Sequence, residues 1–383
     1  MITTPSGNGW RQPCCNATDV VQFFRHDAAK IFPTRFMTTR RLRWVLEGAA
    51  SVFGPIYSAT PLEVLLLAKF RTTCLSEALT SVIIPAFDTV NEIPVFFSNL
   101  RGVDRAEPLY NVHVTDACRA TTAVPIFFPA ATFQEVPGAV NRRDGPRVFN
   151  VIDGGIAVND PTLVAVAQAI AKRRPGARTR FDFLVICLCF PQDFRNVLVL
   201  SLAAGQHPMR FVARPHSSSV EWLVNSSGLP LLSSFFSASA DMVEYYTSMI
   251  FDAHQSGHHY LRIQTDCLPT SQFWGIDDAT PQNLQSLTGT ARNLLNSPVS
   301  KRNFATGRLQ AVTNGGNNRE ALQRFARWLV DERRERRRQP QPDRGPAVRA
   351  CSSMMGAATL VVVCFAVLIM YVASKYVKTA PRI

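Results

Sequence analysis

The stretch Arg147-Val-Phe-Asn-Val-Ile-Asp-Gly-Gly-Ile-Ala-Val-Asn-Asp-Pro-Thr-Leu163 places an apolar run, an aspartate, two glycines and a helix start in succession. The run Val148–Ile152 predicts a strand that ends at Asp153. Asp160 stands before Pro161, which puts a capping side chain ahead of a proline at the first helical position. Because functional groups in open α/β sheets lie at the carboxyl ends of strands, Asp153 is a candidate functional carboxylate.

Gly154 and Gly155 follow this aspartate directly. Two glycines allow a tight turn and the close approach of a substrate or nucleophile, since neither carries a Cβ. Asp-Gly is also common turn chemistry. On these residues alone, a turn aspartate after a buried strand remains the alternative to a catalytic one.

Apolar strand patterns alternate with helical patterns outward from this stretch, which indicates an α/β fold. The run Leu184–Cys189 is apolar at every position and predicts a strand buried on both faces, as in a parallel sheet. The predicted strands are Thr80–Phe87, Val95–Ser98, Val148–Ile152 and Phe183–Phe190. The predicted helices are Ala17–Ile31, Pro61–Thr72, Asp116–Ala123, Pro161–Arg173, Ser219–Phe235, Ala240–Ser256, Pro281–Asn296 and Asn318–Glu335.

The net charge of +13 is unevenly distributed along the 383 residues. Residues 331–383 carry 10 Lys/Arg and 4 Asp/Glu, so +6 lies there and +7 is left for the other 330 residues. The Arg-rich segment could bind nucleic acid, but its position beside an apolar segment favours a membrane surface. We therefore expect no nucleic-acid partner.

That apolar segment, residues 356–374, holds 19 residues without a charge. At about 1.5 Å per residue it nearly matches the ~30 Å hydrocarbon core of a bilayer. Arginines cluster upstream of it, which predicts a tail-anchored protein whose large N-terminal part faces the cytosol. The sequence opens on polar residues instead of a signal peptide, and nine unpaired-looking cysteines indicate a reducing compartment.

The predicted organisation has a globular domain over residues 1–335, a basic linker over 336–355, the membrane span over 356–374 and a short tail over 375–383. The target organelle is not indicated.

Several segments resemble plant patatins. Asp153-Gly-Gly followed by Asn159-Asp-Pro-Thr162 is similar to the family's Asp-Gly-Gly motif and the Asn-Asn-Pro-Thr that follows it. The segment Arg119–Pro129 looks like the family's Arg-Ala-Thr-Ser-Ala-Ala-Pro segment. Further resemblances lie at Tyr260–Gln264, Ile276–Leu284 and Glu320–Ala326, in the same order.

The resemblance implies a patatin-like three-layer fold with a mostly parallel central sheet. It implies a lipid acyl hydrolase that cleaves phospholipids, galactolipids and lysophospholipids with a Ser-Asp dyad, without cofactor or metal. Asp153 would be the general base that accepts the serine proton, and Gly154 and Gly155 would complete the motif. The serine of such enzymes lies in Gly-x-Ser-x-Gly on a sharp strand-to-helix turn.

The sequence contains no Gly-x-Ser-x-Gly and no Gly-rich oxyanion loop. In the family, a segment like Met1–Ser6 follows the nucleophile closely, so we expect the domain to lack its first strands and its serine. One explanation is an incomplete gene model. The other is a genuine truncated relative, a catalytically inactive, membrane-tethered binding or regulatory protein.

Two other features have competing interpretations. Arg119 could meet a substrate phosphate or form a structural ion pair. His258-His259 could suggest a metal site, but on a strand adjacent imidazoles point to opposite faces, so an ordinary polar turn is predicted.

Overall fold

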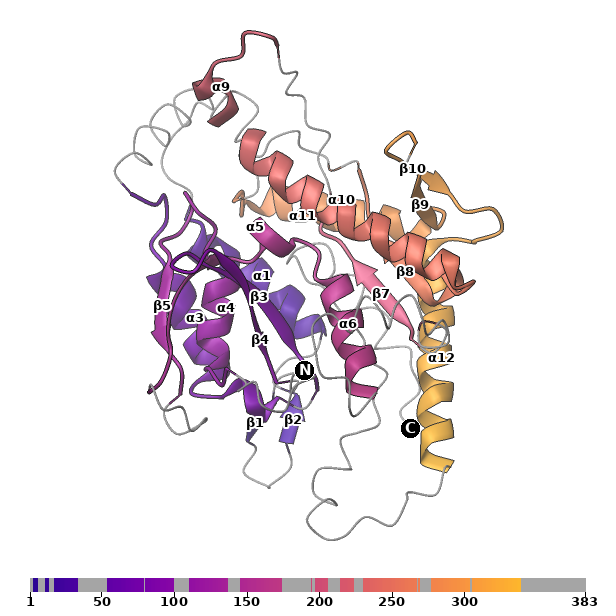
Figure 1. Cartoon of the computed structure of the whole chain (residues 1–383), viewed down its shortest axis with the longest axis horizontal. Helices are drawn as coiled ribbons and strands as arrows, with labels where there is room; N and C mark the ends of the chain where they lie inside the picture. The colour runs from indigo at the N-terminus through magenta and orange to yellow at the C-terminus, as the bar shows by residue number, and fades with distance from the viewer. Residues whose placement is uncertain are drawn as a thin grey trace.

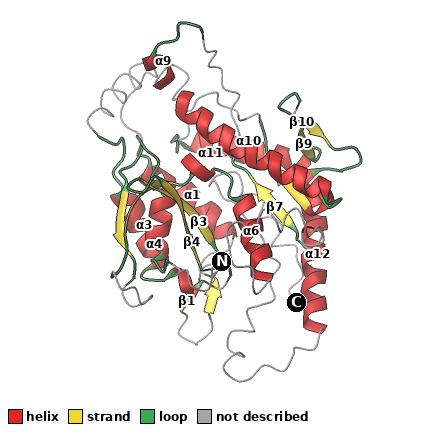
Figure 2. Cartoon of the chain, in the orientation of Figure 1, coloured by secondary structure: helices red, strands yellow, loops and turns green. Residues whose placement is uncertain are grey.

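The structure is a computed structural model, shown in Figures 1 and 2. It describes residues 3–5, 11–13, 17–33, 54–78, 80–99, 110–136, 145–173, 194, 197–205, 214–223, 230–266, 268, 277–303 and 305–338. The predicted strand Phe183–Phe190 and the predicted membrane span at 356–374 lie outside these residues, as do residues 339–355 and the tail 375–383. None of the helices within the described ranges has the length and apolar character needed to span a bilayer.

Helices and strands alternate through most of the described residues, which confirms the α/β class. The helices are α1 (Ala17–Ile31), α3 (Thr60–Phe70), α4 (Val114–Thr121), α5 (Gly155–Val158), α6 (Thr162–Arg173), α9 (Ser219–Leu223), α10 (Pro230–Ala253), α11 (Pro281–Asn296) and α12 (Asn318–Arg338), with 3-10 turns η1 (Leu75–Glu77) and η2 (Gly257–His259). The strands are β1 (Thr3–Pro5), β2 (Arg11–Pro13), β3 (Ile83–Asp88), β4 (Ile93–Ser98), β5 (Ala131–Gln134), β6 (Val148–Asp153), β7 (Val199–Leu202), β8 (Tyr260–Ile263), β9 (Ser300–Asn303) and β10 (Arg308–Ala311).

The sheet that carries Asp153 has four strands in the order β4-β3-β6-β5, and every neighbouring pair is antiparallel. The prediction of a mostly parallel central sheet is therefore wrong for this sheet. For the β3–β4 pair the physical reason is a tight turn between the two strands. Asp88 Oδ1 accepts hydrogen bonds from the N–H groups of Val90 (2.9 Å) and Asn91 (3.2 Å), and Glu92 closes the turn with φ at 55°. A two-strand hairpin of this kind is necessarily antiparallel.

Strands β7 and β8 form a separate parallel pair. All four residues of each strand are buried, as expected for strands covered on both faces. A parallel pair thus exists in β7 and β8, while the strand predicted at Phe183–Phe190 lies outside the described residues.

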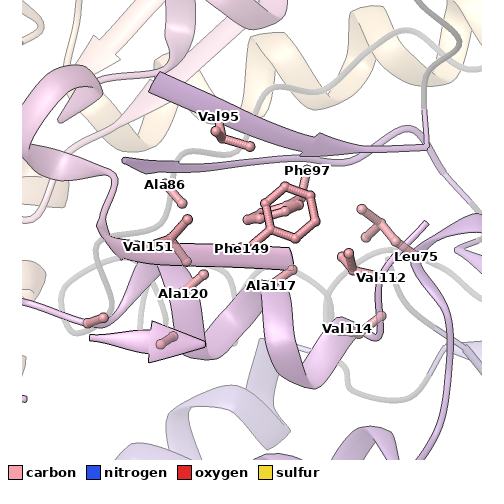
Figure 3. Packing of buried hydrophobic residues seen from close by; sticks show 12 residues of the cluster. Leu75, Ala86, Val95, Phe97, Val112, Val114, Ala117, Ala120, Phe149 and Val151 are labelled. Atoms are coloured by element: carbon pink, nitrogen blue, oxygen red, sulfur yellow. The ribbon is translucent and has the colours of Figure 1, made fainter. Parts of the chain in front are cut away.

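The main core lies between the four-stranded sheet and α4 (Figure 3). Phe97 of β4 and Phe149 of β6 are fully buried, and their rings meet edge to face with centroids 5.2 Å apart. Ala117 and Ala120 are one turn apart on α4 and also fully buried. Their small side chains let the helix approach the aromatic side chains of the sheet, which fixes the far end of β6 at Asp153.

Helix α10 is the longest helix of the described residues, and it corrects the sequence prediction. Two helices were expected, Ser219–Phe235 and Ala240–Ser256, but the structure has one continuous helix over Pro230–Ala253 and a short α9 before it. In Figure 1, α10 runs along one side of the molecule with α5 beside its N-terminal half, and α5 and α10 are in contact.

Candidate functional site

Asp153 lies at the last position of β6, and only 1 % of its surface is exposed. The burial pattern alternates along the strand, so the Asp153 side chain shares a face with buried Phe149 and Val151. Its backbone N–H donates to the carbonyl of Ala123 at 3.1 Å. The aspartate motif and the segment after Arg119 are therefore joined directly.

Burial raises the pKa of the Asp153 carboxyl from 3.8 to about 7. Desolvation disfavours the charged form, and a hydrogen bond from the Gly155 N–H to Oδ1 (2.6 Å) opposes this by stabilising the carboxylate. A pKa near 7 is well suited to a general base at neutral pH, because the group can both accept and return a proton.

Gly154 is required by packing. Its backbone is helical, with φ of −68° and ψ of −19°, a conformation that any residue can adopt. A Cβ at this position would lie 2.4 Å from the carbonyl oxygen of Pro85 on β3. The expectation that the glycine serves a tight turn is therefore only part of the explanation. Its absent side chain lets β3 lie directly against the turn that presents Asp153.

Asp160 anchors the other end of this turn. One carboxylate oxygen accepts a hydrogen bond from the Thr162 N–H (3.0 Å), which is the helix cap that the sequence predicted for α6. The other oxygen forms a buried ion pair with Nη1 of Arg262 on β8. Arg262 Nη1 also donates to Ser201 Oγ at 2.7 Å, and Ser201 Oγ lies 2.9 Å from Thr162 Oγ1.

The ion pairs continue into α10 and β9. Glu244 Oε2 on α10 lies 3.2 Å from Nε of Arg262 and 3.2 Å from Nε of Arg302. The side chains of Glu244 and Arg262 are 3 % and 7 % exposed. This network connects the turn after Asp153 to three further elements. The sequence prediction missed it, although a charged residue inside the apolar strand Tyr260–Ile263 was a signal for it.

Arg119 has a structural role in the described residues. Its guanidinium donates through Nε to Glu63 on α3 (3.1 Å) and through Nη2 to the carbonyl of Pro129 (2.6 Å), and 6 % of the residue is exposed. Of the two interpretations, the structural ion pair agrees with these contacts.

The serine partner of Asp153 has no counterpart among the described residues, where no serine hydroxyl hydrogen-bonds to the Asp153 carboxylate. Ser201 is fully buried, and its hydroxyl is occupied by Thr162 and Arg262. His258 and His259 lie in the 3-10 turn η2, as predicted for a turn, but their rings are 4.1 Å apart and do not point to opposite faces. In the described ranges no group of three or more His, Cys, Asp and Glu side chains could hold a metal ion.

The chain is similar to known proteins both in a family model and in individual sequences. A family model for patatin-like phospholipases matches residues 18–166, the part that contains Asp153, Gly154, Gly155 and the Asp160 cap. Patatin-like protein 2 of Oryza sativa subsp. indica is 34 % identical over 347 residues, covering 89 % of this chain and 81 % of the relative. Patatin-like protein 3 of Arabidopsis thaliana is 32 % identical over 334 residues, covering 85 % and 73 %. Patatin-07 of Solanum tuberosum is 31 % identical over 340 residues, covering 88 % and 77 %.

Proposed function

Because the chain belongs to the patatin-like phospholipase family, we propose that it is a patatin-type lipid acyl hydrolase domain in which Asp153 is the proton acceptor. The observation that carries this proposal is the buried carboxylate at the end of β6, whose pKa burial raises to about 7. A carboxylate with this pKa can take a proton from a serine hydroxyl and return it within one reaction cycle at neutral pH.

The proposed chemistry is nucleophilic catalysis by a Ser-Asp dyad. Asp153 accepts the serine proton as the serine oxygen bonds to the acyl carbonyl carbon, and the protonated carboxyl then gives that proton to the departing alcohol oxygen. A water molecule attacks the acyl-serine in the second half, and its proton follows the same route through Asp153. The 383 residues hold the aspartate of this dyad and no serine in Gly-x-Ser-x-Gly.

The substrates that we propose are acyl esters of membrane lipids, namely phospholipids, galactolipids and lysophospholipids. The family supports lipid as the substrate class. The choice among head groups and acyl positions is open to experiment.

The missing motif supports a second candidate function, a catalytically inactive lipid-binding or regulatory protein. Without an activated nucleophile and an oxyanion loop, Asp153 alone cannot cleave an ester. In this case the buried network around Asp160 would preserve the fold and the lipid-binding surface, and no acyl-enzyme would form.

One experiment separates the two functions. The endogenous gene with its upstream genomic sequence and the 383-residue chain are expressed in parallel, and each is assayed for phospholipid and galactolipid hydrolysis and for labelling by a fluorophosphonate probe. We expect hydrolysis and labelling from the gene product and neither from the 383-residue chain. Labelling of the 383-residue chain would show a nucleophile outside the family motif, and failure of both proteins would support the inactive protein.

Asp153→Asn in the gene product tests the role of the carboxylate. The amide keeps the shape of the side chain but cannot accept the proton, so we expect hydrolysis to fall about a thousandfold or more. Equal hydrolysis by the wild-type gene product and by its Asp153→Asn variant would show that Asp153 takes no part in the mechanism.

We further propose that residues 356–374 anchor the protein in a membrane with the globular domain in the cytosol. The support is the length and charge-free composition of the segment and the arginines upstream of it. The protein should resist extraction by high salt and by alkaline carbonate, and a protease added outside sealed organelles should digest the domain. Release by salt alone would contradict a span.

A further inference from the structure

Helix α10 exposes one continuous apolar face. Exposed residues recur at intervals of three and four along it, which places them within one narrow arc of the helix. We call this face the apolar stripe, and its residues are Leu231, Phe235, Ala238, Met242, Tyr246 and Met249. Its five large side chains are between 39 % and 58 % exposed.

Exposed large hydrophobic residues of the described surface are concentrated in the apolar stripe. Of the 14 large hydrophobic residues that are exposed there, five belong to the stripe and two more, Val220 and Leu223, to α9, which contacts α10. Single exposed apolar residues need no explanation, but a contiguous group marks a binding surface.

The opposite face of α10 is held against the candidate site. Asn159 Nδ2 donates to the carbonyl of Phe236 (2.9 Å), and Ser239 Oγ donates to the carbonyl of Ala157 (3.2 Å). Glu244 faces inward to Arg262 and Arg302. Glu244 therefore lies on the side of α10 opposite the stripe, whereas Ser239 lies at the flank of the stripe, so α5 sits beside it.

The charges of α10 argue for an electrically neutral occupant. The helix contains no lysine or arginine, and its three acidic residues are engaged with basic side chains of β9 and β8. None of the six stripe residues is charged. A surface that recognises anionic lipid head groups would present Lys or Arg beside its apolar residues.

The area of the stripe argues against a second copy of this chain. With roughly 200 Å² for a fully exposed large side chain, the five large residues of the stripe expose about 500 Å². A stable protein interface takes about 600–1,000 Å² from each partner, so the stripe falls below this range. A lipid surface has no such minimum, because partially buried aromatic and aliphatic side chains suffice for reversible interfacial binding.

We propose that the apolar stripe of α10 docks the protein on an electrically neutral lipid surface, such as a phosphatidylcholine bilayer. Docking brings α5, which contacts α10 and follows the end of β6, close to the lipid. The benefit of this placement for lipid hydrolysis rests on the proposed function, whereas the docking itself requires only the stripe.

Photocrosslinking in the full chain tests the docking locally, so that binding through any other segment does not affect the result. Phe235 and Met242 are each replaced by photoreactive p-benzoylphenylalanine, and the protein is irradiated with phosphatidylcholine vesicles. Leu67 on α3, which is 53 % exposed against 58 % for Phe235, is the matched control position. We expect lipid adducts at both stripe positions in yields on the order of tenfold above Leu67.

Three outcomes would overturn the proposal. Equal lipid yields at Leu67 and at the stripe would show that the contact is nonspecific. Chain-to-chain adducts at Phe235 or Met242 would show that a second copy covers the stripe. Loss of the adducts in about 1 M salt, where charges are screened beyond about 3 Å, would show that charge drives binding.

A second set of variants separates docking from catalysis. Asp153→Asn should leave the adduct yields unchanged, since docking does not use the carboxylate. Adducts without lipid hydrolysis by the gene product would refute the proposed function alone. Hydrolysis without adducts would refute the docking alone. Phe235→Ser/Tyr246→Ser, with the photoreactive residue at Met242, should lower the lipid adduct several-fold because the neighbouring contacts are lost.

Discussion

The backbone N–H of Gly155 donates a hydrogen bond to Oδ1 of Asp153 at 2.6 Å, within a turn that is closed to solvent. The N–H favours the ionised carboxylate, while burial of the side chain favours the neutral acid, and burial is the larger effect. The balance keeps the pKa close to neutral, so the turn geometry and the core together define the chemistry of this aspartate.

The raised pKa has a consequence for stability. Between pH 3.8 and about 7, Asp153 is ionised in the unfolded chain but protonated in the folded protein. The contribution of Asp153 to the free energy of unfolding is therefore fully present below pH 3.8 and is lost as the pH rises to about 7. At about 1.4 kcal/mol per pH unit the loss amounts to roughly 4 kcal/mol. The free energy of unfolding is measured in urea near pH 4 and near pH 8. On going to the higher pH, the Asp153→Asn variant should become more stable relative to the wild type by this amount. An identical pH dependence in both proteins would contradict the raised pKa.

Gly154→Ala should destabilise the protein by about 2 kcal/mol or more. The new Cβ would lie 2.4 Å from the carbonyl oxygen of Pro85. Neither the backbone of Gly154 nor that of Pro85 can move away without breaking the β3–β6 pairing. Gly289→Ala is the matched control. Gly289 lies in α11 with nothing within 4 Å of its added Cβ, so the substitution should stabilise by about 0.5–1 kcal/mol. Chemical denaturation measures both, and a neutral Gly154→Ala would show that the contact is not tight.

Arg262→Met should cost about 3–5 kcal/mol, because it leaves the buried carboxylates of Asp160 and Glu244 without their shared partner. Lys301→Met removes an ion pair with Asp252 whose side chains are 40 % and 56 % exposed, and should cost less than about 1 kcal/mol. Thermal unfolding of the two variants at neutral pH gives the comparison. Similar costs would mean that the buried network contributes no more than a surface pair.

Phe149→Ala should cost about 3–5 kcal/mol, since Phe149 is fully buried and its ring contacts Phe97, Tyr110 and Phe133 with centroids 5.2–5.4 Å apart. Val148 precedes it on the same strand but is 49 % exposed, so Val148→Ala should cost less than about 1 kcal/mol. Urea denaturation followed by circular dichroism distinguishes them. A small loss of unfolding free energy in Phe149→Ala would show that this ring does not belong to the main core.

Local chemistry made parts of this fold predictable from sequence. The bounds of α1 and α11 agree with the prediction at both ends, and the Thr280 side chain caps α11 through the Asn283 N–H. Asp153 was correctly placed at a strand end because an apolar run, two glycines and a capped helix define that boundary without reference to the rest of the chain.

Features that depend on distant contacts were not predictable. The prediction left residues 236–239 outside any helix, yet α10 continues through them because the Ser239 hydroxyl bonds to Ala157 and the inner face of the helix is packed. The antiparallel β3–β6 pair brings Ala86 opposite Asp153, far apart in the sequence. The ion pairs of Arg262 join residues as far apart as 102 positions in the sequence, and no local pattern specifies such a pairing.

A pH titration of the Asp153 carboxyl in the folded chain tests its role as the base. The titration is followed by carbon NMR of labelled aspartate, with Asp153→Asn to assign the signal. We predict a pKa of about 7 for this group, so that it exchanges a proton at neutral pH. A midpoint close to the ordinary value of 3.8 would contradict it, because a carboxylate that stays ionised would not be the poised base described here.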